Sequence, residues 1–371
     1  MEVLRRIWAL VVKEFLALLK DKRSRLTLVV PPLVQLLIFS YAATFDLNQV
    51  NYAVYNQDQG QASRELLGYF QGSSAFKLAA TLDHLGQVAP DINDQKVMMV
   101  LHIPQDFTRN MLQGRSGQVQ VIIDGRNSNT AMVLLSYVNT IVNSFSAQWA
   151  QDHGWPSPPA ELKVRTWFNP NLESRWFIVP GIVGLLTLVV SLVVTSLSVA
   201  REREAGTFDQ LLVTPLHPAE ILLGKALPGI FIGLAEGSVI VFLSVNLFGV
   251  PLLGGLGALY LGMALFIISA VGLGLMISSI AVTQQQALLG AFLFLVPAVI
   301  LSGFATPIAN MPEVVQKFTL INPLRYFLVI VRSVFLEGAD ISLLWPLYWP
   351  MAVIGTVTMI IAGWLFRNRL Y

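Results

Sequence analysis

The sequence predicts an α-helical polytopic membrane protein with six transmembrane helices and a mixed α/β extracytoplasmic domain inserted between helices 1 and 2. Two measures of the 371-residue chain support this class: only 12% of its residues are Asp, Glu, Lys or Arg, and its mean hydropathy is +0.63. An average soluble domain carries about 25% charged residues. Much of the surface must therefore lie in lipid, which excludes a disordered protein, a coiled coil and an ordinary cytosolic enzyme.

The composition also excludes several kinds of site. A net charge of +2 is too small for a nucleic-acid footprint, so we expect no nucleic-acid partner. The chain has no cysteine, which excludes disulfides, thiolate nucleophiles and cysteine-based metal sites. Its histidines lack the spacing and the acidic neighbours of a metal site, so we expect no metal and no catalytic residues.

Residues 1–25 are predicted to form a cytoplasmic amphipathic helix at the membrane surface. Apolar residues recur at helical spacing from Leu4 to Leu19, with Trp8 among them, and the basic residues lie at the other positions. Such a helix suits the inner headgroup layer, so membrane lipids are expected partners. Packing against a neighbouring subunit is a compatible alternative.

Six apolar stretches have the length of a membrane span, for which about 20 residues are needed. They are Leu26–Phe45 (span 26–45), Trp176–Ala200, Ala226–Phe248, Leu256–Ala281, Ala287–Ile308 and Leu343–Phe366. Glu236 is the one Asp, Glu, Lys or Arg residue within them. The run Leu324–Leu336 has 13 residues and contains Arg332, so we expect a re-entrant or interfacial helix there, within an outer segment 309–342.

The distribution of Lys and Arg orients the chain. Residues 1–25 hold seven of the 24 basic residues, the loop 201–225 holds three and the C-terminal tail two. The nine in residues 46–175 count little, because long segments are translocated largely regardless of their charge. We therefore expect both termini and the loop 201–225 in the cytoplasm, and residues 46–175 outside the membrane, in the periplasm.

Residues 46–175 are predicted to fold as a separate α/β domain, because short β-type runs alternate with helical ones. A length of 130 residues is enough for one core. The β-type runs are Tyr52–Tyr55, Phe76–Ala79, Val97–His102, Val119–Ile123 and Leu162–Thr166, and the helical ones are Ser63–Phe70, Phe107–Leu112 and Asn129–Gln151. Residues 176–371 then form a five-helix transmembrane bundle.

The sequence contains no ATP-binding loop. Its one Gly-Lys pair, Gly224-Lys225, has Ala219 where a phosphate loop requires glycine and Ala226 where it requires Ser or Thr. We therefore expect a chain that is not an enzyme and binds no cofactor. Any ATP and Mg would be bound by another polypeptide.

The cytoplasmic loop 201–225 carries the most informative motif. It runs Arg201-Glu202-Arg203-Glu204-Ala205-Gly206-Thr207-Phe208-Asp209-Gln210-Leu211-Leu212-Val213-Thr214-Pro215 and continues to Gly224-Lys225. Gly206 is expected to end the helix of the span, and Thr207 to cap a short helix over Phe208–Val213 that stops at Pro215. The side chains expected to contact a partner's groove are Phe208, Leu211 and Leu212. The alternative is an ordinary charged loop.

This motif resembles the hallmark of permease subunits of type 2 ABC exporters, bacterial drug exporters included. The resemblance continues in Thr283-Gln284-Gln285-Gln286-Ala287, Ser302-Gly303-Phe304, Pro307-Ile308-Ala309-Asn310-Met311-Pro312 and Asn322-Pro323-Leu324-Arg325-Tyr326. The order of one span, a large outer domain and five further spans also fits that family. As a set these matches are specific, whereas each alone would be weak.

The resemblance implies a permease in a bacterial inner membrane that exports an amphipathic or lipid-like compound, drugs among the candidates, while separate ABC ATPase subunits hydrolyse ATP. It also implies a second permease, identical or paralogous, and the outer domain could contact a periplasmic adaptor. By resemblance, the ATPase-coupling residues are Arg201, Glu202, Arg203, Glu204, Gly206, Thr207, Phe208, Leu211, Leu212, Thr214 and Pro215. The outer-gate candidates are Phe304, Pro307, Pro312 and Pro323.

Glu236 is the candidate for the substrate pathway. It lies in the small-residue pattern Gly229-x-x-x-Gly233-x-x-x-Gly237, along which helices approach closely. A charge at a helix centre costs about 2.5–3.5 kcal/mol on insertion scales, and such residues tend to face a cavity or a partner. Glu236 therefore either lines the path and contacts a cationic or polar substrate, or is a protonated or hydrogen-bonded structural residue.

Arg325 and Arg332 of the outer segment are expected to extend to lipid phosphates.

Two other classes of protein are compatible with parts of the sequence. A membrane sensor would use the outer domain to bind a ligand, but it gives no reason for five further spans. An ion-driven secondary transporter would need inverted repeats and several intramembrane ionisable groups, whereas this chain has one such group and no detectable repeat.

Overall fold

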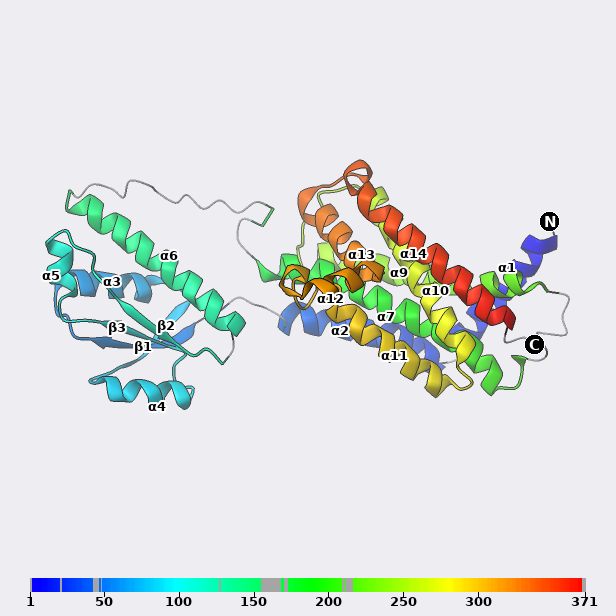
Figure 1. Cartoon of the computed structure of the whole chain (residues 1–371), viewed down its shortest axis with the longest axis horizontal. Coiled ribbons are helices and arrows are strands. Elements are labelled where there is room, and N and C mark those ends of the chain that lie inside the picture. Colours follow the sequence, from blue (N-terminus) through cyan, green and yellow to red (C-terminus); the bar gives the residue numbers. More distant parts are fainter. Residues whose placement is uncertain are drawn as a thin grey trace. The chain divides into compact units, whose positions relative to one another are not determined.

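The computed structural model describes residues 2–20, 22–42, 47, 49–126, 128–154, 168–169, 173–208, 210 and 216–368. The chain divides into two compact units, of which one comprises Met1–Thr44 with Thr166–Tyr371 and the other Phe45–Arg165. The first unit is helical and the second contains a β-sheet (Figure 1). The inserted unit therefore separates α1 and α2 in the sequence from the helices on which they pack.

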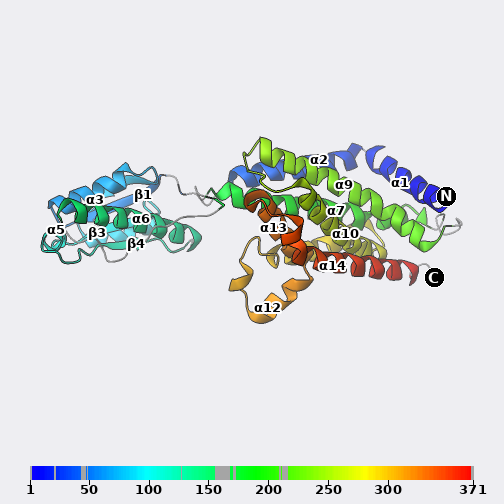
Figure 2. The same ribbon diagram turned by 90° about the horizontal axis from the view of Figure 1, so that it is seen from above.

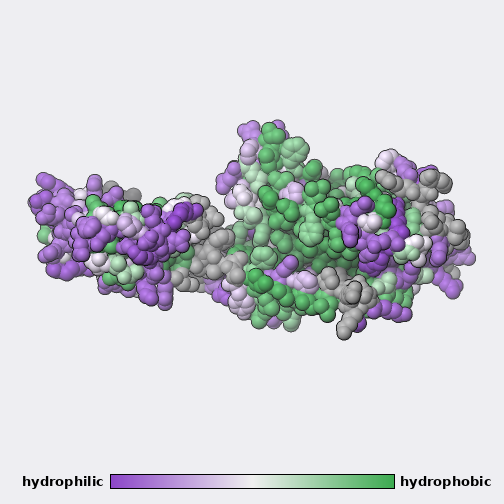
Figure 3. All heavy atoms as spheres, turned by 90° about the horizontal axis from the view of Figure 1, so that it is seen from below, coloured by the Kyte–Doolittle hydropathy of each residue, from purple (hydrophilic) through white to green (hydrophobic). Residues whose placement is uncertain are grey.

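The helical unit contains the long apolar helices of the chain. Its helices are α1 (Glu2–Lys20), α2 (Lys22–Ala42), α7 (Ser174–Glu204), α9 (Pro218–Asn246), α10 (Leu256–Ile280), α11 (Gln284–Ile300), α12 (Glu313–Phe318), α13 (Pro323–Arg332) and α14 (Ile341–Asn368). Among the described residues, α7, α9, α10 and α14 are long and apolar enough to cross a membrane. The surface of this unit is broadly apolar, whereas hydrophilic side chains cover most of the second unit (Figure 3). The protein is thus a mostly helical, multi-pass membrane protein.

Two of the six predicted spans correspond to shorter apolar helices. The first lies in α2, whose apolar part is Val29–Tyr41 and which contains Pro31 and Pro32. The fifth is α11, which has 17 residues and ends at Ile300, so the prediction that this span extends to Ile308 is wrong. The helix stops because Ser302 and Gly303 form a turn, in which Gly303 has a φ of +86° that favours glycine.

Helix α7 lies in the middle of the bundle, with α9, α10 and α13 around it (Figure 2). Close contact between α7 and its neighbours depends on glycines, which carry no side chain to separate the backbones. A Cβ on Gly233 of α9 would overlap the hydroxyl of Ser191, and one on Gly237 would lie 3.2 Å from Thr187 Oγ1. The small-residue pattern of α9 therefore faces α7.

A sharp bend follows α11. The segments Glu313–Ile321, which is α12 with the 3₁₀ turn η3 (Thr319–Ile321), and Pro323–Glu337, which is α13 with the π turn η4 (Ser333–Glu337), meet at 84°. Asn322 lies at the bend, where its Oδ1 accepts from the backbone N–H of Leu324 at 3.1 Å and its Nδ2 donates to the carbonyl oxygen of Ala298 at 2.7 Å. This one side chain caps α13 and ties it to the end of α11.

The second unit is built on a four-stranded sheet with the order β2-β1-β3-β4. β1 (Val50–Asn56) is parallel to β2 (Phe76–Thr81) and β3 (Met99–Ile103), and β4 (Gln120–Ile123) is antiparallel to β3. Its helices are α3 (Gln61–Gly72), α4 (Val88–Asn93), α5 (Phe107–Leu112) and α6 (Ser128–Asp152), with a 3₁₀ turn at Leu85–Gln87.

Side chains from both faces of this sheet are buried. Tyr52 and Met99 pack with α3 and α6, whereas Ala53 and Val100 pack with Val88 of α4. Strands occur at four of the five predicted β-type runs, and helices at the three predicted helical ones. The fifth run, Leu162–Thr166, lies outside the described residues.

We predict that Gly274→Val destabilises the bundle by about 1–3 kcal/mol, the range typical of overpacked cores. A Cβ on Gly274 of α10 would overlap Thr195 Oγ1 and lie 3.0 Å from the carbonyl oxygen of Leu192, both on α7. Gly257→Val on the same helix is the control, because a Cβ there meets no atom within 4 Å. Thermal unfolding in detergent should separate the two variants, and equal melting temperatures would contradict the close contact of α7 and α10.

Candidate functional site

The candidate site lies at the end of the helical unit where the two chain ends are found (Figures 1 and 2). The middle of α1, the end of α7, the start of α9 and the end of α14 lie there. The coupling motif predicted from the sequence continues directly from α7, so the site can be built from these four elements.

Helix α1 packs on the first turns of α9. Its buried face consists of Val11, Glu14 and Leu18. The close approach requires Gly224 of α9, because a Cβ at that position would lie 2.6 Å from the Cβ of Leu10. The glycine of the Gly224-Lys225 pair therefore makes room for α1.

The lysine of the same pair is the centre of a buried charged cluster. Lys225 Nζ lies 2.9 Å from Glu14 Oε1 on α1 and 2.7 Å from Glu202 Oε2 on α7. Glu202 Oε1 also accepts from Lys13 Nζ at 2.5 Å. Three helices that are distant in the sequence are thus joined through a single ammonium group.

The cluster is balanced in charge and is largely shielded from solvent. The side chain of Lys225 is 3% exposed and those of Glu14 and Glu202 are each 10% exposed, whereas that of Lys13 is half-exposed. Ionised groups lose several kcal/mol of hydration when buried and persist only with close partners of opposite charge. The positions of α1, α7 and α9 are therefore mutually dependent.

Three charged residues of the predicted coupling motif contact other helices of the same chain. Glu202 faces inward to the cluster. Arg203 Nη1 donates to the carbonyl oxygens of Ser279 and Ala281, at 3.0 and 3.2 Å, at the end of α10. Glu204 Oε2 accepts from the backbone N–H of Gln284 at 2.8 Å. These three charges fasten the end of α7 to its neighbours.

The expectation that Phe208 is available to a partner's groove is wrong for this structure. Its side chain is buried, with the ring edge-on to Phe366 at 5.9 Å between centroids and Arg203 4.9 Å from the ring centre. Gly206, with a φ of +68°, follows the end of α7 as expected. Leu211, Leu212, Thr214 and Pro215 lie outside the described residues.

A cleft opens beside the charged cluster, between α1 and the end of α7. Its volume is about 540 Å³, within the range of ligand pockets. Its polar lining includes Lys13, Glu14, Arg201, Glu202 and Gln210. We name this feature the α1–α7 cleft. It can receive a short segment of another chain and place it against both helices.

The structure places Glu236 away from this cleft, within α9. Both of its carboxylate oxygens are shielded from solvent and have no hydrogen-bond partner among the described residues. The same holds for the hydroxyls of Thr187 and Ser191, which face the adjacent glycines of α9. Two hydroxyls at the α7–α9 contact, and the carboxylate of Glu236 on α9, therefore have no hydrogen-bond partner among the described residues.

The predicted gate residues do not form one cluster. Phe304 packs against α7, since a Cβ on Gly181 would lie 2.5 Å from its ring, and Pro323 is buried in the first turn of α13. Pro307 and Pro312 are exposed on either side of a 3₁₀ turn, Ile308–Asn310. Phe304 is thus the gate candidate that contacts a central helix.

The expectation that Arg332 extends to lipid phosphates is wrong here, whereas for Arg325 it stays a prediction. Arg325 is half-buried, and its Nη1 donates to Thr319 Oγ1. The guanidinium of Arg332 lies 3.9 Å from the ring centre of Phe177, and its Nε and Nη2 are shielded, with no hydrogen-bond partner among the described residues. The face of an aromatic ring attracts a cation, so Phe177 stabilises the guanidinium of Arg332 in this shielded position.

Sequence reasoning missed Glu14 as a member of the site, and it included Lys225 at the end of the motif without a partner for its charge. Glu14 lies between Val11 and Leu18 at helical spacing, so it occupies the apolar face of an amphipathic helix. Lys225 directly precedes a predicted span. An acid and a base at two otherwise apolar positions indicate a buried ion pair, although only the fold shows that they meet.

Fold and site together define a class: a multi-pass helical membrane protein whose amphipathic N-terminal helix is joined to its spanning helices by buried charges. The chain belongs to the ABC-2 family of transporter proteins, whose family model matches residues 22–364. It is a permease of the ABC transporter type.

Three relatives illustrate this membership. The chain is 38% identical to the probable multidrug ABC transporter permease YbhR of Escherichia coli K12, over 98% of this chain and 99% of the relative. It is 36% identical to the probable multidrug ABC transporter permease YbhS of the same organism, over 90% and 89%. It is 30% identical to the inner membrane transport permease YhhJ of E. coli K12, over 100% and 99%.

We predict that Lys225→Met destabilises the protein by about 3–5 kcal/mol, because two buried carboxylates lose their shared partner. The double variant Lys225→Met with Glu14→Met should recover most of this loss, since the pair of Lys13 and Glu202 remains balanced. Lys20→Met, which removes an exposed lysine from the same α1, should have little effect. Melting temperatures in detergent test this ordering, and a double variant less stable than Lys225→Met would contradict it.

Proposed function

We propose that this permease exports an amphipathic or lipid-like compound, drugs included, across a bacterial inner membrane, and that separate ABC ATPase subunits bind ATP and Mg and hydrolyse ATP. Family membership supports the ATPase partner. The names of the relatives, multidrug permeases and an inner membrane permease, support the substrate class and the location. The observation that carries the coupling role is the α1–α7 cleft, which lies where a cytoplasmic ATPase would reach the ends of several helices.

The cleft suits docking because some of its polar side chains are exposed and are not used in hydrogen bonds or ion pairs among the described residues. Glu202, Arg203 and Glu204 are engaged within the chain. Arg201 is partly exposed and Gln210 is exposed, and both line the cleft. A segment of an ATPase inserted there would press on α1 and α7 at once. Through Lys225 the same movement would be transmitted to α9.

The remaining parts of the proposal concern the assembled transporter. Two permeases, identical or paralogous, would pair, each with six spans, cytoplasmic termini and the unit 45–165 in the periplasm, where it could contact an adaptor. α1 would lie in the inner headgroup layer, since Leu4, Trp8 and Val12 form an exposed apolar stripe. The bent pair around Asn322 would be re-entrant at the outer face, where Phe304 would help to close the exit.

Glu236 is proposed to contact the substrate when the path opens. Its carboxylate has no partner among the described residues, and two unpaired hydroxyls occupy the same helix contact. Polar groups buried without partners cost free energy, and a cationic or polar substrate would supply the missing interactions.

We expect the pair of substitutions Arg201→Glu and Gln210→Glu to weaken recovery of the ATPase with the permease at least tenfold, which corresponds to about 1.4 kcal/mol of binding free energy. A negative charge in place of Arg201 would repel the acidic group of the ATPase that Arg201 attracts. Co-purification from membranes and ATP turnover in vesicles measure the effect. Arg367→Glu, an exposed arginine at the end of α14, is the matched control. Normal recovery and turnover in the double variant would refute docking at the cleft.

For Glu236→Gln we expect export of cationic compounds to fall while export of neutral ones continues, because the amide keeps the shape but loses the negative charge. Export by inverted vesicles that contain the permease and its ATPase is the measurement, with thermal stability as a check on folding. Equal loss for both kinds of compound, or no loss for either, would rule out the substrate contact.

A further inference from the structure

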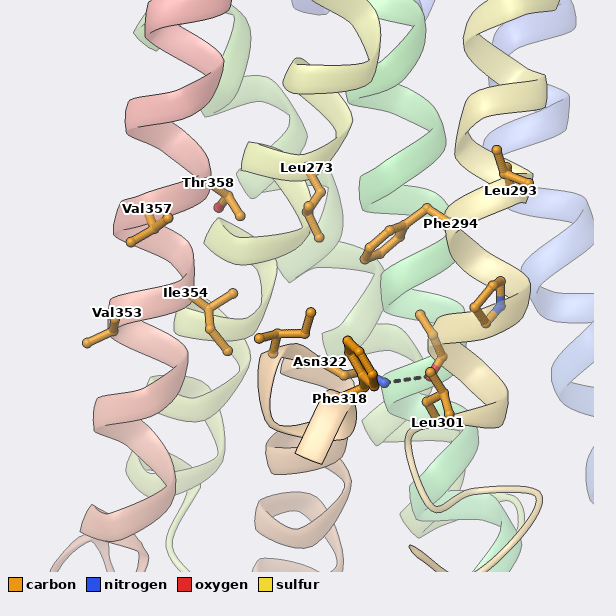
Figure 4. A pocket seen from close by; sticks show the side chains of 13 residues that line it. Leu273, Leu293, Phe294, Leu301, Phe318, Asn322, Val353, Ile354, Val357 and Thr358 are labelled. Carbon is orange, nitrogen blue, oxygen red and sulfur yellow. Dashed lines mark hydrogen bonds between the residues drawn. The ribbon is translucent and has the colours of Figure 1, made fainter. Parts of the chain in front are cut away.

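A cavity of about 610 Å³ lies in the helical unit between α11 and α14, over α10. One wall is Leu293, Phe294 and Pro297 of α11, and the other is Val353, Ile354 and Val357 of α14. Figure 4 shows the two helices on either side, with Phe318 and Asn322 closing one end. We name this feature the α11–α14 groove. It lies along spanning or apolar helices and apart from the α1–α7 cleft.

The side chains of the groove offer a ligand almost no hydrogen bonds. Asn322 uses its amide on Ala298 and Leu324. Thr358 donates its hydroxyl to the carbonyl oxygen of Gly355 at 3.0 Å. The other lining side chains are apolar. A polar ligand would lose its hydration without finding partners, so the lining selects a hydrocarbon.

The groove is open to the lipid-facing surface of the bundle. Leu293 is 78% exposed and Phe318 62% exposed in this chain, and Val353 and Val357 are also exposed. In a membrane the medium that meets these side chains is the acyl region of the bilayer. A hydrocarbon-lined space that opens into hydrocarbon fills with a chain end, because an empty space would forfeit dispersion contacts along its walls.

A basic residue directly precedes Phe318, which lines one end of the groove. Lys317 is exposed and precedes Ile321, which lines the groove, by one helical turn. Glu313 lies a further turn away, so the lysine is nearer to the groove than the acid. The stretch of α11 that lines the groove, from Leu293 to Leu301, is about 12 Å long at 1.5 Å per residue. An acyl chain lying along it would place a phosphate towards Lys317.

We propose that the α11–α14 groove binds one acyl chain of a membrane phospholipid, with its phosphate towards Lys317. The bound chain packs against Phe318 and Pro297, on both sides of the hydrogen bond between Asn322 and Ala298. The lipid is thus a structural part of the joint between α11 and the bent pair. This inference is independent of what the transporter exports and of where the ATPase docks.

The test uses the full chain in nanodiscs that contain a phospholipid with a photoreactive diazirine in its acyl chain. After illumination, mass spectrometry of peptides should find adducts concentrated on the groove walls, at residues 293–301 and 353–358. Leu293→Trp fills the rim of the groove and should lower these adducts several-fold. Leu289→Trp is the control, since Leu289 lies one turn earlier on α11, is 72% exposed and does not line the groove.

A second pair repeats the comparison from the opposite wall. Val357→Trp should lower the adducts on α11, whereas Ile361→Trp, one turn along α14 and outside the groove, should not. Lys317→Gln should reduce retention of the lipid in native mass spectrometry. Adducts spread evenly along α11 and α14, or equal effects of Leu293→Trp and Leu289→Trp, would overturn the proposal.

The remaining occupant to test is a second copy of this chain. Because the sequence contains no cysteine, Leu293→Cys and Leu289→Cys each introduce a single thiol. Rapid oxidative dimerisation at position 293 but not at 289, in native membranes, would place another copy in the groove and overturn the lipid assignment. Slow dimerisation at both positions, together with the expected adducts, supports the acyl chain, whereas rapid dimerisation at both would place another copy on this face and overturn the assignment.

Discussion

The arrangement of α1, α7 and α9 depends on the ion pairs that the buried ammonium of Lys225 makes with Glu14 and Glu202. Each of the three groups would be costly to bury alone, so the helices that carry them cannot shift independently. The arrangement explains why glycine precedes the lysine: Gly224 lets α1 come close enough for Glu14 to reach Nζ. The charged motif at the end of α7 therefore holds helices of the same chain together, and the α1–α7 cleft lies beside it.

Helix α7 connects the distinctive regions of the helical unit. Its end carries Glu202 in the charged cluster, its middle faces α9 near Glu236, and its first turns contact Arg332 and Phe304. With 31 residues it is about 45 Å long. Close contacts through glycines leave α7 little freedom to slide along its neighbours.

Much of this fold could be predicted from the sequence, because hydropathy and helical spacing reflect forces that act locally. The helices α7, α10 and α14 and the strands β1 to β4 lie close to their predicted ranges. The errors concern partners that only tertiary structure supplies. Phe208 is apolar beside a charged run, and nothing local shows that Phe366 covers it. From its chemistry alone, Arg332 is expected to face lipid, and only the fold shows that its guanidinium lies over the ring of Phe177. Glu14 and Lys225 are separated by 211 residues, a distance at which spacing carries no information.

That separation also has a temporal side. Ribosomes add about 5–20 residues per second, so Glu14 is made roughly 10–40 s before the Lys225 that neutralises it. During that interval residues 45–165 and the whole of α7 are made, but the part of α9 that carries Lys225 is not yet present. The first helix of this permease can therefore take its final place only after more than half of the chain has been synthesised.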